Sequence, residues 1–204
     1  MNNLQGLYVI TDPDLCSSDI INNVEQAILG GAQVIQYRNK AGNKLQQRAE
    51  ASALQSLCSQ HERVFIINDD ISLALEINAD GVHLGQTDSN ILEARKHLGD
   101  KKIIGITCHN DINAAITAQT KTANYVAFGR FYPSLTKPSA PPADIDILQQ
   151  AKSQLQIPIV AIGGISVENA PTLINAGADM LAVIHAVFGQ SNILKAASDF
   201  KKLF

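Results

Sequence analysis

The stretch Ala178-Asp179-Met180-Leu181-Ala182-Val183 runs from the end of a predicted helix into a short apolar run. The pairs Ala32-Gln33, Ala79-Asp80 and Ala123-Asn124 stand in the same relation to three earlier apolar runs. Successive pairs are 47, 44 and 55 residues apart, about the length of two strand–helix units. This internal repeat predicts a chain built from such units, with one pair leading into every second strand.

Short runs of apolar and β-branched residues recur along the chain and predict strands. We find eight of them, at residues 7–11, 34–38, 64–68, 81–84, 103–108, 125–129, 158–163 and 180–186. Helical patterns lie between the runs; in the first, Val24 and Ile28 follow Ile20 at helical spacing, and Gly30-Gly31 supplies a stop. Because the runs are apolar almost throughout instead of alternating, they are typical of parallel strands buried on both faces.

Parallel strands that alternate with helices indicate an α/β fold. Eight units share 204 residues at about 25 each, which predicts a single (β/α)8 TIM barrel over residues 1–204. An open, doubly wound sheet of six strands is the alternative, and it would leave two of the runs without a place. We therefore expect the barrel, with its active site at the carboxyl ends of the strands.

Charge and cysteine content exclude several classes of protein. The chain has 16 Lys and Arg against 19 Asp and Glu, so its net charge of −3 gives no basic field for nucleic acid. Cys16, Cys58 and Cys108 lack the spacing of a disulfide framework or a thiolate metal site. No signal-peptide pattern opens the sequence, and no apolar run approaches the roughly 18 residues of a membrane span. We expect a cytoplasmic protein without nucleic-acid or membrane partners.

Polar residues gather where the predicted strands end. Gln36, Arg38 and Lys40 end the second strand, and alternation along an extended segment places all three on one side. Thr107 lies at the end of the fifth strand. The planar fork of Arg38 and the point charge of Lys40 both suit phosphate oxygens. This arrangement predicts a site for an anion of diphosphate size.

A long loop is predicted after the sixth strand, at about residues 130–142. Proline residues would interrupt any helix there, namely Pro133, Pro138, Pro141 and Pro142. Since strand patterns continue on both sides, the segment suits a lid over a ligand better than a linker between domains. Its Lys137 would add a third cation at the mouth of the barrel.

Two acids at neighbouring strand ends predict a metal site. Asp69 follows the third strand and Asp88 follows the fourth. Carboxylate oxygens suit Mg²⁺, which keeps several waters and bridges substrate phosphates. The alternative interpretation is a helix N-cap, because Asp69 and Asp70 precede the apolar helical pattern that begins at Ile71. We assign that cap to Asp70.

A second anion site is predicted after the seventh and eighth strands, where barrels of this type frequently bind phosphate. Gly163-Gly164 ends the seventh strand and Ser166 is predicted to open the next helix, so backbone N–H groups could face an anion. The eighth strand ends near Ile184-His185. Two anionic substrates are therefore expected.

Nucleophilic and zinc catalysis are not favoured. Cys108 and His109 are adjacent at a strand end, so their side chains point to opposite sides and do not easily pair. None of the five histidines shows the H-x-x-x-H spacing of a zinc site. We interpret His83, within the fourth strand, as a hydrogen-bonded structural residue rather than as a base.

Five motifs together resemble the thiamine phosphate synthase family. They are residues 36–40, the turn 68–70, residues 81–88, the loop that ends in Thr136-Lys137-Pro138, and residues 161–165. The resemblance covers residues 7–188 and keeps the five motifs in order on the expected strands. It implies an enzyme that joins 4-amino-2-methyl-5-hydroxymethylpyrimidine diphosphate to hydroxyethylthiazole phosphate, releases diphosphate and needs Mg²⁺.

The resemblance also implies the roles of individual residues. Asp69 and Asp88 would hold the metal. The residues implied to bind the pyrimidine diphosphate are Gln36, Arg38, Lys40, Asn68, Thr107 and Lys137, and Tyr37 and Asn39 are also expected to bind substrate. Of these, Arg38, Lys40, Thr107 and Lys137 would be catalytic. The residues implied to hold the thiazole phosphate are Ser134, Leu135, Thr136, Gly164, Ile184 and His185.

The sequence departs from the family pattern at several positions. Thr107 and His185 replace common serines, Asn39 replaces a common acid, and Arg130 and Met180 replace common proline and glycine residues. Thr107 keeps a hydroxyl, so only the role of His185 is put in doubt. Two alternatives are weighed: a related barrel that isomerises the thiazole phosphate, and a noncatalytic barrel that senses thiamine precursors. The isomerase is disfavoured because Arg130 stands where those relatives carry a catalytic histidine.

Overall fold

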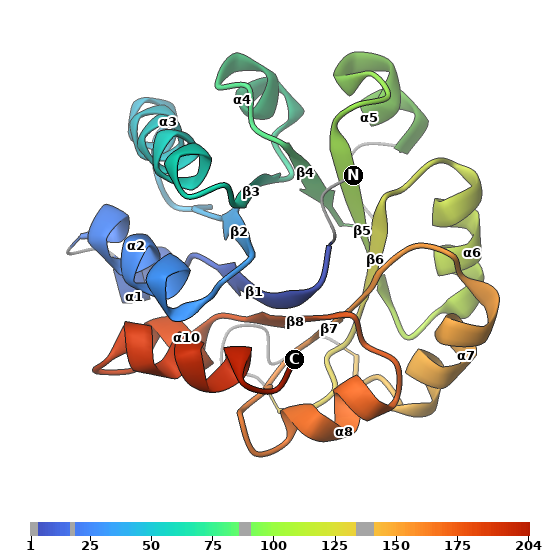
Figure 1. Ribbon diagram of the computed structural model, residues 1–204. Coiled ribbons are helices and arrows are strands. Elements are labelled where there is room, and N and C mark those ends of the chain that lie inside the picture. The colour runs from blue at the N-terminus through green and yellow to red at the C-terminus, as the bar shows by residue number, and fades with distance from the viewer. Residues whose placement is uncertain (1–3, 17–18, 86–90, 134–140) are drawn as a thin grey trace.

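Eight parallel strands close into a barrel in the computed structural model, which describes residues 4–16, 19–85, 91–133 and 141–204. Figure 1 shows the ring of strands with helices around its outside. The strands are β1 (Gly6–Ile10), β2 (Val34–Tyr37), β3 (Val64–Asn68), β4 (Gly81–Leu84), β5 (Ile103–His109), β6 (Tyr125–Phe128), β7 (Ile159–Ile162) and β8 (Met180–Val183). Since β8 pairs with β1, the predicted barrel is confirmed and the open sheet is wrong.

Most of the helices connect successive strands on the outside of the barrel, and the last two follow β8. They are α1 (Pro13–Cys16), α2 (Ile20–Gly30), α3 (Lys44–Gln60), α4 (Ile71–Glu76), α5 (Ile91–Leu98), α6 (Ile112–Thr120), α7 (Asp146–Gln154), α8 (Ala170–Asn175), α9 (His185–Phe188) and α10 (Ile193–Lys201). As predicted, Asp70 caps α4, and its carboxylate accepts a hydrogen bond from the Leu73 N–H. None of the helices in the described part of the chain is long and apolar enough to cross a membrane.

The repeated pairs that precede every second strand have a structural reason. In three of the four pairs, the polar side chain accepts a hydrogen bond from a backbone N–H near the start of the preceding strand. These bonds join Asp80 to Phe65 at 2.8 Å, Asn124 to Ile104 at 2.8 Å, and Asp179 to Ile159 at 2.9 Å. The fourth residue, Gln33, accepts from Arg63 instead. The repeat therefore secures the strands at the amino-terminal end of the barrel, opposite the predicted site.

Apolar side chains form two buried groups, one on each side of the strands. The larger group lies between the strands and the helices and includes Leu54 of α3 and Phe200 of α10. The smaller group fills the barrel and contains aliphatic residues together with two tyrosines, Tyr8 and Tyr125. Burial on both faces explains why the strands read as apolar almost throughout.

Two sequence predictions about local structure are wrong. Ser166 does not open a helix: α8 begins at Ala170, and the Ser166 N–H donates to Asn169 Oδ1 in the preceding turn. The last strand ends at Val183 rather than extending to residue 186. Ile184 leaves the extended conformation there, and His185 begins the short helix α9.

Candidate active site

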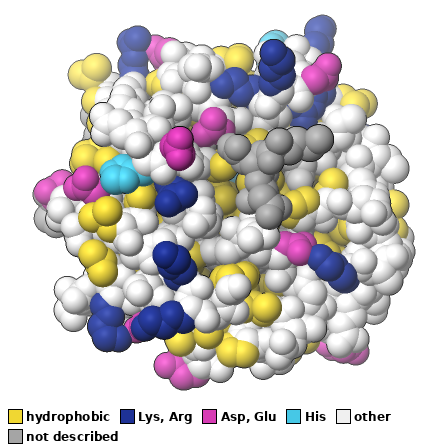
Figure 2. Space-filling view, in the orientation of Figure 1, with side chains coloured by type: hydrophobic (Ala, Val, Ile, Leu, Met, Phe, Trp, Pro, Cys, Tyr) yellow, Lys and Arg dark blue, Asp and Glu magenta, His cyan; other side chains and the backbone are white. Residues whose placement is uncertain are grey.

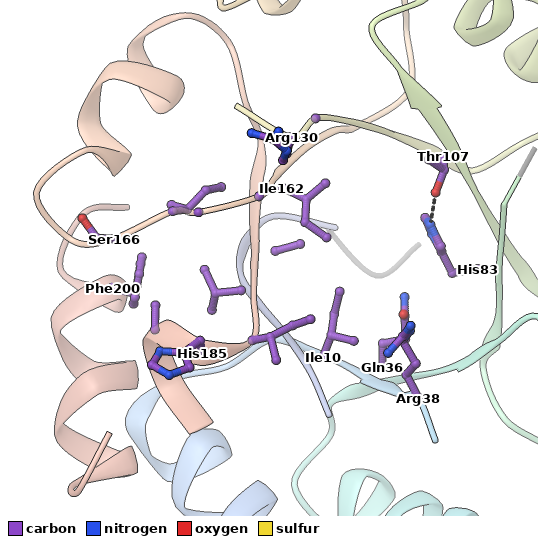
Figure 3. Close-up of a pocket in the computed structure, with 18 of the residues that line it drawn as sticks. Ile10, Gln36, Arg38, His83, Thr107, Arg130, Ile162, Ser166, His185 and Phe200 are labelled. Carbon is purple, nitrogen blue, oxygen red and sulfur yellow. Dashed lines mark hydrogen bonds between the residues drawn. The ribbon is translucent and has the colours of Figure 1, made fainter. Parts of the chain in front are cut away.

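A cavity of about 550 Å³ opens at the carboxyl ends of the strands, which is the end predicted for the site. Its size is typical of pockets that hold small molecules. Figure 3 shows side chains from opposite sides of the barrel pointing into it. Of the residues assigned to substrate or metal binding in the sequence analysis, those that line the cavity are Gln36, Arg38, Lys40, Asn68, Asp69, Thr107, Gly164, Ile184 and His185.

Arg38 and Lys40 bring positive charge to one rim of the cavity. Within the described residues, the Nε atom of Arg38 is buried without a hydrogen-bond partner. Thr11, which follows β1, holds the Arg38 backbone in place, since its hydroxyl accepts from the Arg38 N–H at 2.9 Å. A buried guanidinium donor without a partner on the protein favours the binding of an anion.

Asp69 supplies negative charge beside these cations. Its Oδ2 atom lies 3.0 Å from Lys40 Nζ and accepts a hydrogen bond of 2.6 Å from Asn68 Nδ2. The backbone of Asp69 has a positive φ of 63°, uncommon for a residue with a side chain, and its N–H donates to the His83 carbonyl. This carboxylate already binds a cation, the Lys40 ammonium, and its hard oxygens fit Mg²⁺.

His83 and Thr107 form part of the same wall. His83 Nε2 lies 2.8 Å from Thr107 Oγ1, and both side chains line the cavity (Figure 3). Gln36, on strand β2, is only 2% exposed and donates from Nε2 to the Tyr8 hydroxyl at 2.6 Å. His83 is thus hydrogen-bonded as predicted, but it also lines the cavity, which the sequence analysis missed.

The opposite end of the cavity is built around two glycines. Both have positive φ values, 103° at Gly163 and 64° at Gly164. A Cβ atom at Gly163 would lie 2.2 Å from the Cβ of Arg130, and one at Gly164 would lie 2.3 Å from the Pro133 carbonyl oxygen. Only glycine therefore fits here, because the chain after β6 packs directly over this turn.

Arg130 is a cationic residue that the sequence analysis used only to disfavour the isomerase. It lines the cavity near Ile162, on the side of the glycine turn (Figure 3). Arg130 follows Gly129, which lies just beyond the end of β6. Alternation of side chains along a strand therefore made no prediction for Arg130. His185 also lines this end, and a Cβ atom at Gly189 would lie 2.8 Å from its ring. The His185 ring therefore packs against Gly189, in agreement with a space-filling role.

Two implied substrate-binding residues lie away from this cavity. The Tyr37 hydroxyl donates to Glu50 Oε2 at 2.6 Å, on the helix side of the barrel wall. Asn39 donates to the same carboxylate and accepts from the Gly42 N–H, so it lines a smaller, separate cavity of about 220 Å³. Alternation explains both positions, because residues 37 and 39 face opposite to residues 36, 38 and 40.

Several residues named in the sequence analysis lie outside the described residues. They are Asp88, Ser134, Leu135, Thr136 and Lys137. Within the described ranges there is no cluster of three or more metal-ligating His, Cys, Asp or Glu side chains. Cys108 is fully buried, and burial raises the pKa of its thiol to about 12, which does not suit a nucleophile.

Residues 7–187 match the family model described as thiamine monophosphate synthase. The chain belongs to this family. It is 49% identical to the thiamine-phosphate synthase of Alcanivorax borkumensis over 94% of this chain and 89% of the relative. It is 48% identical to that of Nitrosococcus oceani over 100% of this chain and 94% of the relative. The thiamine phosphate pyrophosphorylase of Pyrococcus furiosus has the same fold, with a TM-score of 0.90, 32% identity, and coverage of 99% and 96% of the two chains.

Family membership confirms the resemblance seen in the sequence. On the face shown in Figure 2, Lys and Arg side chains are interspersed with Asp and Glu, so no continuous basic patch covers it. At the cavity rim, charges of both signs come from Arg38, Lys40 and Asp69.

Proposed function

We propose that the protein is a thiamine phosphate synthase, which joins a pyrimidine diphosphate to a thiazole phosphate and releases diphosphate. The single observation that carries this proposal is the rim at which Arg38, Lys40 and Asp69 meet around one cavity. Membership of the family supports the same activity, that of a transferase in thiamine biosynthesis. The substrates are small phosphorylated molecules, and we infer that the reaction takes place in the cytoplasm.

The pyrimidine diphosphate occupies the cationic side of the cavity. Arg38 offers a planar pair of donors to its phosphate oxygens, and Lys40 adds a mobile point charge from the rim. As the bond to the diphosphate breaks, negative charge grows on the leaving oxygen, and these cations bind that charge more strongly than they bind the intact substrate. Thr107 and Asn68 donate further hydrogen bonds from the same wall, and Lys137 adds a third cation.

An apolar surface faces the carbon from which diphosphate departs. Ile10 and Ile162 line the centre of the cavity between its two polar ends (Figure 3). Such side chains exclude water, which would otherwise capture the pyrimidinylmethyl cation before the thiazole nitrogen attacks it. Positioning and electrostatics then supply the acceleration, and no covalent bond to the protein is formed.

We assign Mg²⁺ to Asp69 and Asp88. When bound, the ion would neutralise charge on the diphosphate. Asp69 would hold it through a carboxylate oxygen, while Lys40, its partner in this structure, turns to the substrate. At the other end, the glycine turn 163–164 and the Ile184-His185 backbone hold the thiazole phosphate, and Arg130 adds positive charge. From the family resemblance, we also assign Ser134, Leu135 and Thr136 to this phosphate.

A coupled assay tests this function. Purified protein is mixed with both phosphorylated substrates, with and without Mg²⁺, and thiamine phosphate and diphosphate are measured. We expect metal-dependent formation of both products. Conversion of the thiazole phosphate alone would identify an isomerase instead, and binding without diphosphate release would identify a precursor sensor.

Neighbouring acids provide a matched pair of variants for this assay. Asp69→Asn should weaken Mg²⁺ binding and lower turnover by on the order of 100-fold, because one charge that acts at the leaving group is lost. Asp70→Asn should keep normal turnover, because Asp70 caps α4 and pairs with Lys44 outside the cavity, and asparagine is also a good cap. Normal turnover of Asp69→Asn at limiting metal would refute its assignment.

A further inference from the structure

A continuous chain of hydrogen bonds crosses the barrel beneath the cavity. Gln36 Nε2 donates to the Tyr8 hydroxyl at 2.6 Å, and that hydroxyl lies 2.8 Å from the Tyr125 hydroxyl. Tyr125 lies 2.9 Å from His83 Nδ1, and His83 Nε2 lies 2.8 Å from Thr107 Oγ1. Gln36, His83 and Thr107 line the cavity, whereas the two tyrosines are fully buried below it.

The barrel leaves space for this chain at Gly105. In register, Gly105 lies between His83 on β4 and Tyr125 on β6. A Cβ atom at Gly105 would lie 1.9 Å from the Tyr125 ring, so only glycine allows this ring to reach across β5. The His83 and Tyr125 rings then stack at 5.6 Å, and the Tyr8 and Tyr125 rings meet edge to face at 6.0 Å.

Each tyrosine hydroxyl has one hydrogen, and this fixes the direction of the whole chain. Burial raises the pKa of Tyr8 and of Tyr125 well above the ordinary value, so both hydroxyls keep that hydrogen. Because Gln36 donates to Tyr8, each buried hydroxyl hydrogen finds an acceptor within this chain only if Tyr8 donates to Tyr125 and Tyr125 donates to His83 Nδ1. A His83 ring with a single N–H hydrogen then carries it on Nε2 and donates to Thr107.

Reversing the chain requires every member to change at once. If Thr107 donates to His83, each later bond reverses, and the Gln36 amide must turn so that its oxygen accepts from Tyr8. In the first direction, which begins with Gln36 as the donor to Tyr8, Thr107 is free to donate into the cavity and Gln36 offers its amide oxygen to a ligand. In the reversed direction, Thr107 offers only a lone pair and Gln36 offers its NH₂ group.

We propose that Tyr125 is a positioning and specificity-determining residue. Through the hydrogen-bond chain, it couples the group with which Thr107 binds the diphosphate and the group with which Gln36 binds the pyrimidine ring. This inference rests on the proposed function. A phosphate oxygen accepts hydrogen bonds, so a bound diphosphate requires Thr107 to donate and selects the first direction. Gln36 must then accept, which selects a ring with an amino donor and rejects a ring with a carbonyl oxygen at that position.

Binding measurements on two ligands test the coupling without turnover. Isothermal titration calorimetry compares 4-amino-2-methyl-5-hydroxymethylpyrimidine diphosphate with its 4-oxo analogue, with Mg²⁺ present and the thiazole phosphate absent. The wild-type protein should prefer the amino ligand at least about tenfold. The oxygen of the 4-oxo ligand would face the Gln36 amide oxygen, and neither atom can donate a hydrogen bond to the other. Tyr125→Phe breaks the chain and frees the Gln36 amide, so this preference should fall below about threefold.

If Tyr125 had a merely structural role, Tyr125→Phe would lower the affinity for both ligands equally and leave the preference unchanged. Tyr8→Phe breaks the chain at another link and should also lose the preference. Tyr132→Phe is the control: among the residues that the structure describes, its hydroxyl bonds the Asn169 carbonyl alone, at 3.5 Å, so the wild-type ratio should persist. An unchanged ratio in Tyr125→Phe and Tyr8→Phe would overturn the inference and leave the proposed function intact. Wild-type protein that binds neither ligand would overturn both.

The tautomer of His83 gives a second measurement, which is read from the wild-type complex itself. Nitrogen-15 NMR of the wild-type complex with the amino ligand should show the hydrogen on Nε2, with the His83 signal assigned through His83→Gln. A hydrogen on Nδ1 in that complex would overturn the proposed direction of the chain.

Discussion

At the scale of single residues, the barrel wall positions Arg38 for the proposed binding of diphosphate. Its backbone is fixed by Thr11 and its Nε is buried without a partner in the described part of the chain. We expect Arg38→Ala to lower kcat/KM by on the order of 100-fold and to weaken binding of inorganic diphosphate, because a preplaced donor is lost. Arg38→Lys should recover only part of this loss, since lysine lacks the planar fork.

The matched control for Arg38→Ala is Arg48→Ala. Arg48 lies on α3 and pairs with Glu76 on the surface, so its removal should leave diphosphate binding and turnover unchanged. Thermal unfolding checks that both variants remain folded. Wild-type diphosphate affinity in Arg38→Ala would contradict the role of this side chain.

Alternation along a strand predicted one group of residues that the structure brings together at the cavity. It placed Gln36, Arg38 and Lys40 on one face, and all three line the cavity. The same rule explains why Tyr37 and Asn39, taken from the contiguous family motif, lie elsewhere. Arg130 gave no such signal, because it follows a glycine beyond the strand end. Its approach to the cavity depends on how the chain after β6 packs over Gly163.

At the scale of elements, the polar residues that precede alternate strands hold the amino-terminal end of the barrel. Asn124 Oδ1 accepts from the Ile104 N–H and from Arg95 Nη2, each at 2.8 Å. Asn124→Ala should lower the free energy of unfolding by about 2 kcal/mol, because a backbone N–H is left unsatisfied in the barrel wall. Turnover at 25 °C should be unchanged, since this position lies at the opposite end from the cavity.

Gln33→Ala is the control for this element. Gln33 occupies the equivalent position before β2 but bonds the half-buried side chain of Arg63 rather than a backbone N–H. We expect Gln33→Ala to lower the free energy of unfolding, measured with urea, by less than about 1 kcal/mol. Equal losses in the two variants would refute the importance of the backbone contact.

The repeat predicted the order of the elements, but it did not predict how each begins. Asp70 was assigned correctly as a cap because the apolar helical pattern starts at the next residue. Ser166 was assigned wrongly because Asn169 accepts its N–H in a turn of its own, which delays α8 to Ala170. Such competition between neighbouring polar side chains depends on local geometry that residue spacing does not contain.

At the scale of the whole molecule, closing the barrel buries ionisable side chains on both faces of its wall. Burial raises the pKa of Cys16 to about 11 and those of Cys58 and Cys108 to about 12. It also raises the pKa values of three tyrosines, namely Tyr8, Tyr37 and Tyr125. All of these groups are neutral when protonated, so the folded protein keeps protons that the unfolded chain releases as the pH rises.

The free energy of unfolding should therefore fall at alkaline pH. The stability is fully present below the unfolded pKa values, about 8.5 for thiols and about 10 for tyrosines, and it is lost above them. Each group lowers the free energy of unfolding by about 1.4 kcal/mol per pH unit over the pH range in which it is ionised only in the unfolded chain. Urea unfolding between about pH 8 and 10.5, in the presence of a reductant, measures this slope.

Cys58→Ala isolates one group, because Cys58 is fully buried. The variant should be less stable near neutral pH, but its stability should fall less steeply above about pH 9, by about 1.4 kcal/mol per pH unit. Val24→Ala removes a buried side chain of similar size that does not ionise, and its curve should run parallel to that of the wild type. If the Cys58→Ala curve also runs parallel, the thiol ionises equally in both states, and closure of the barrel does not shield it from water.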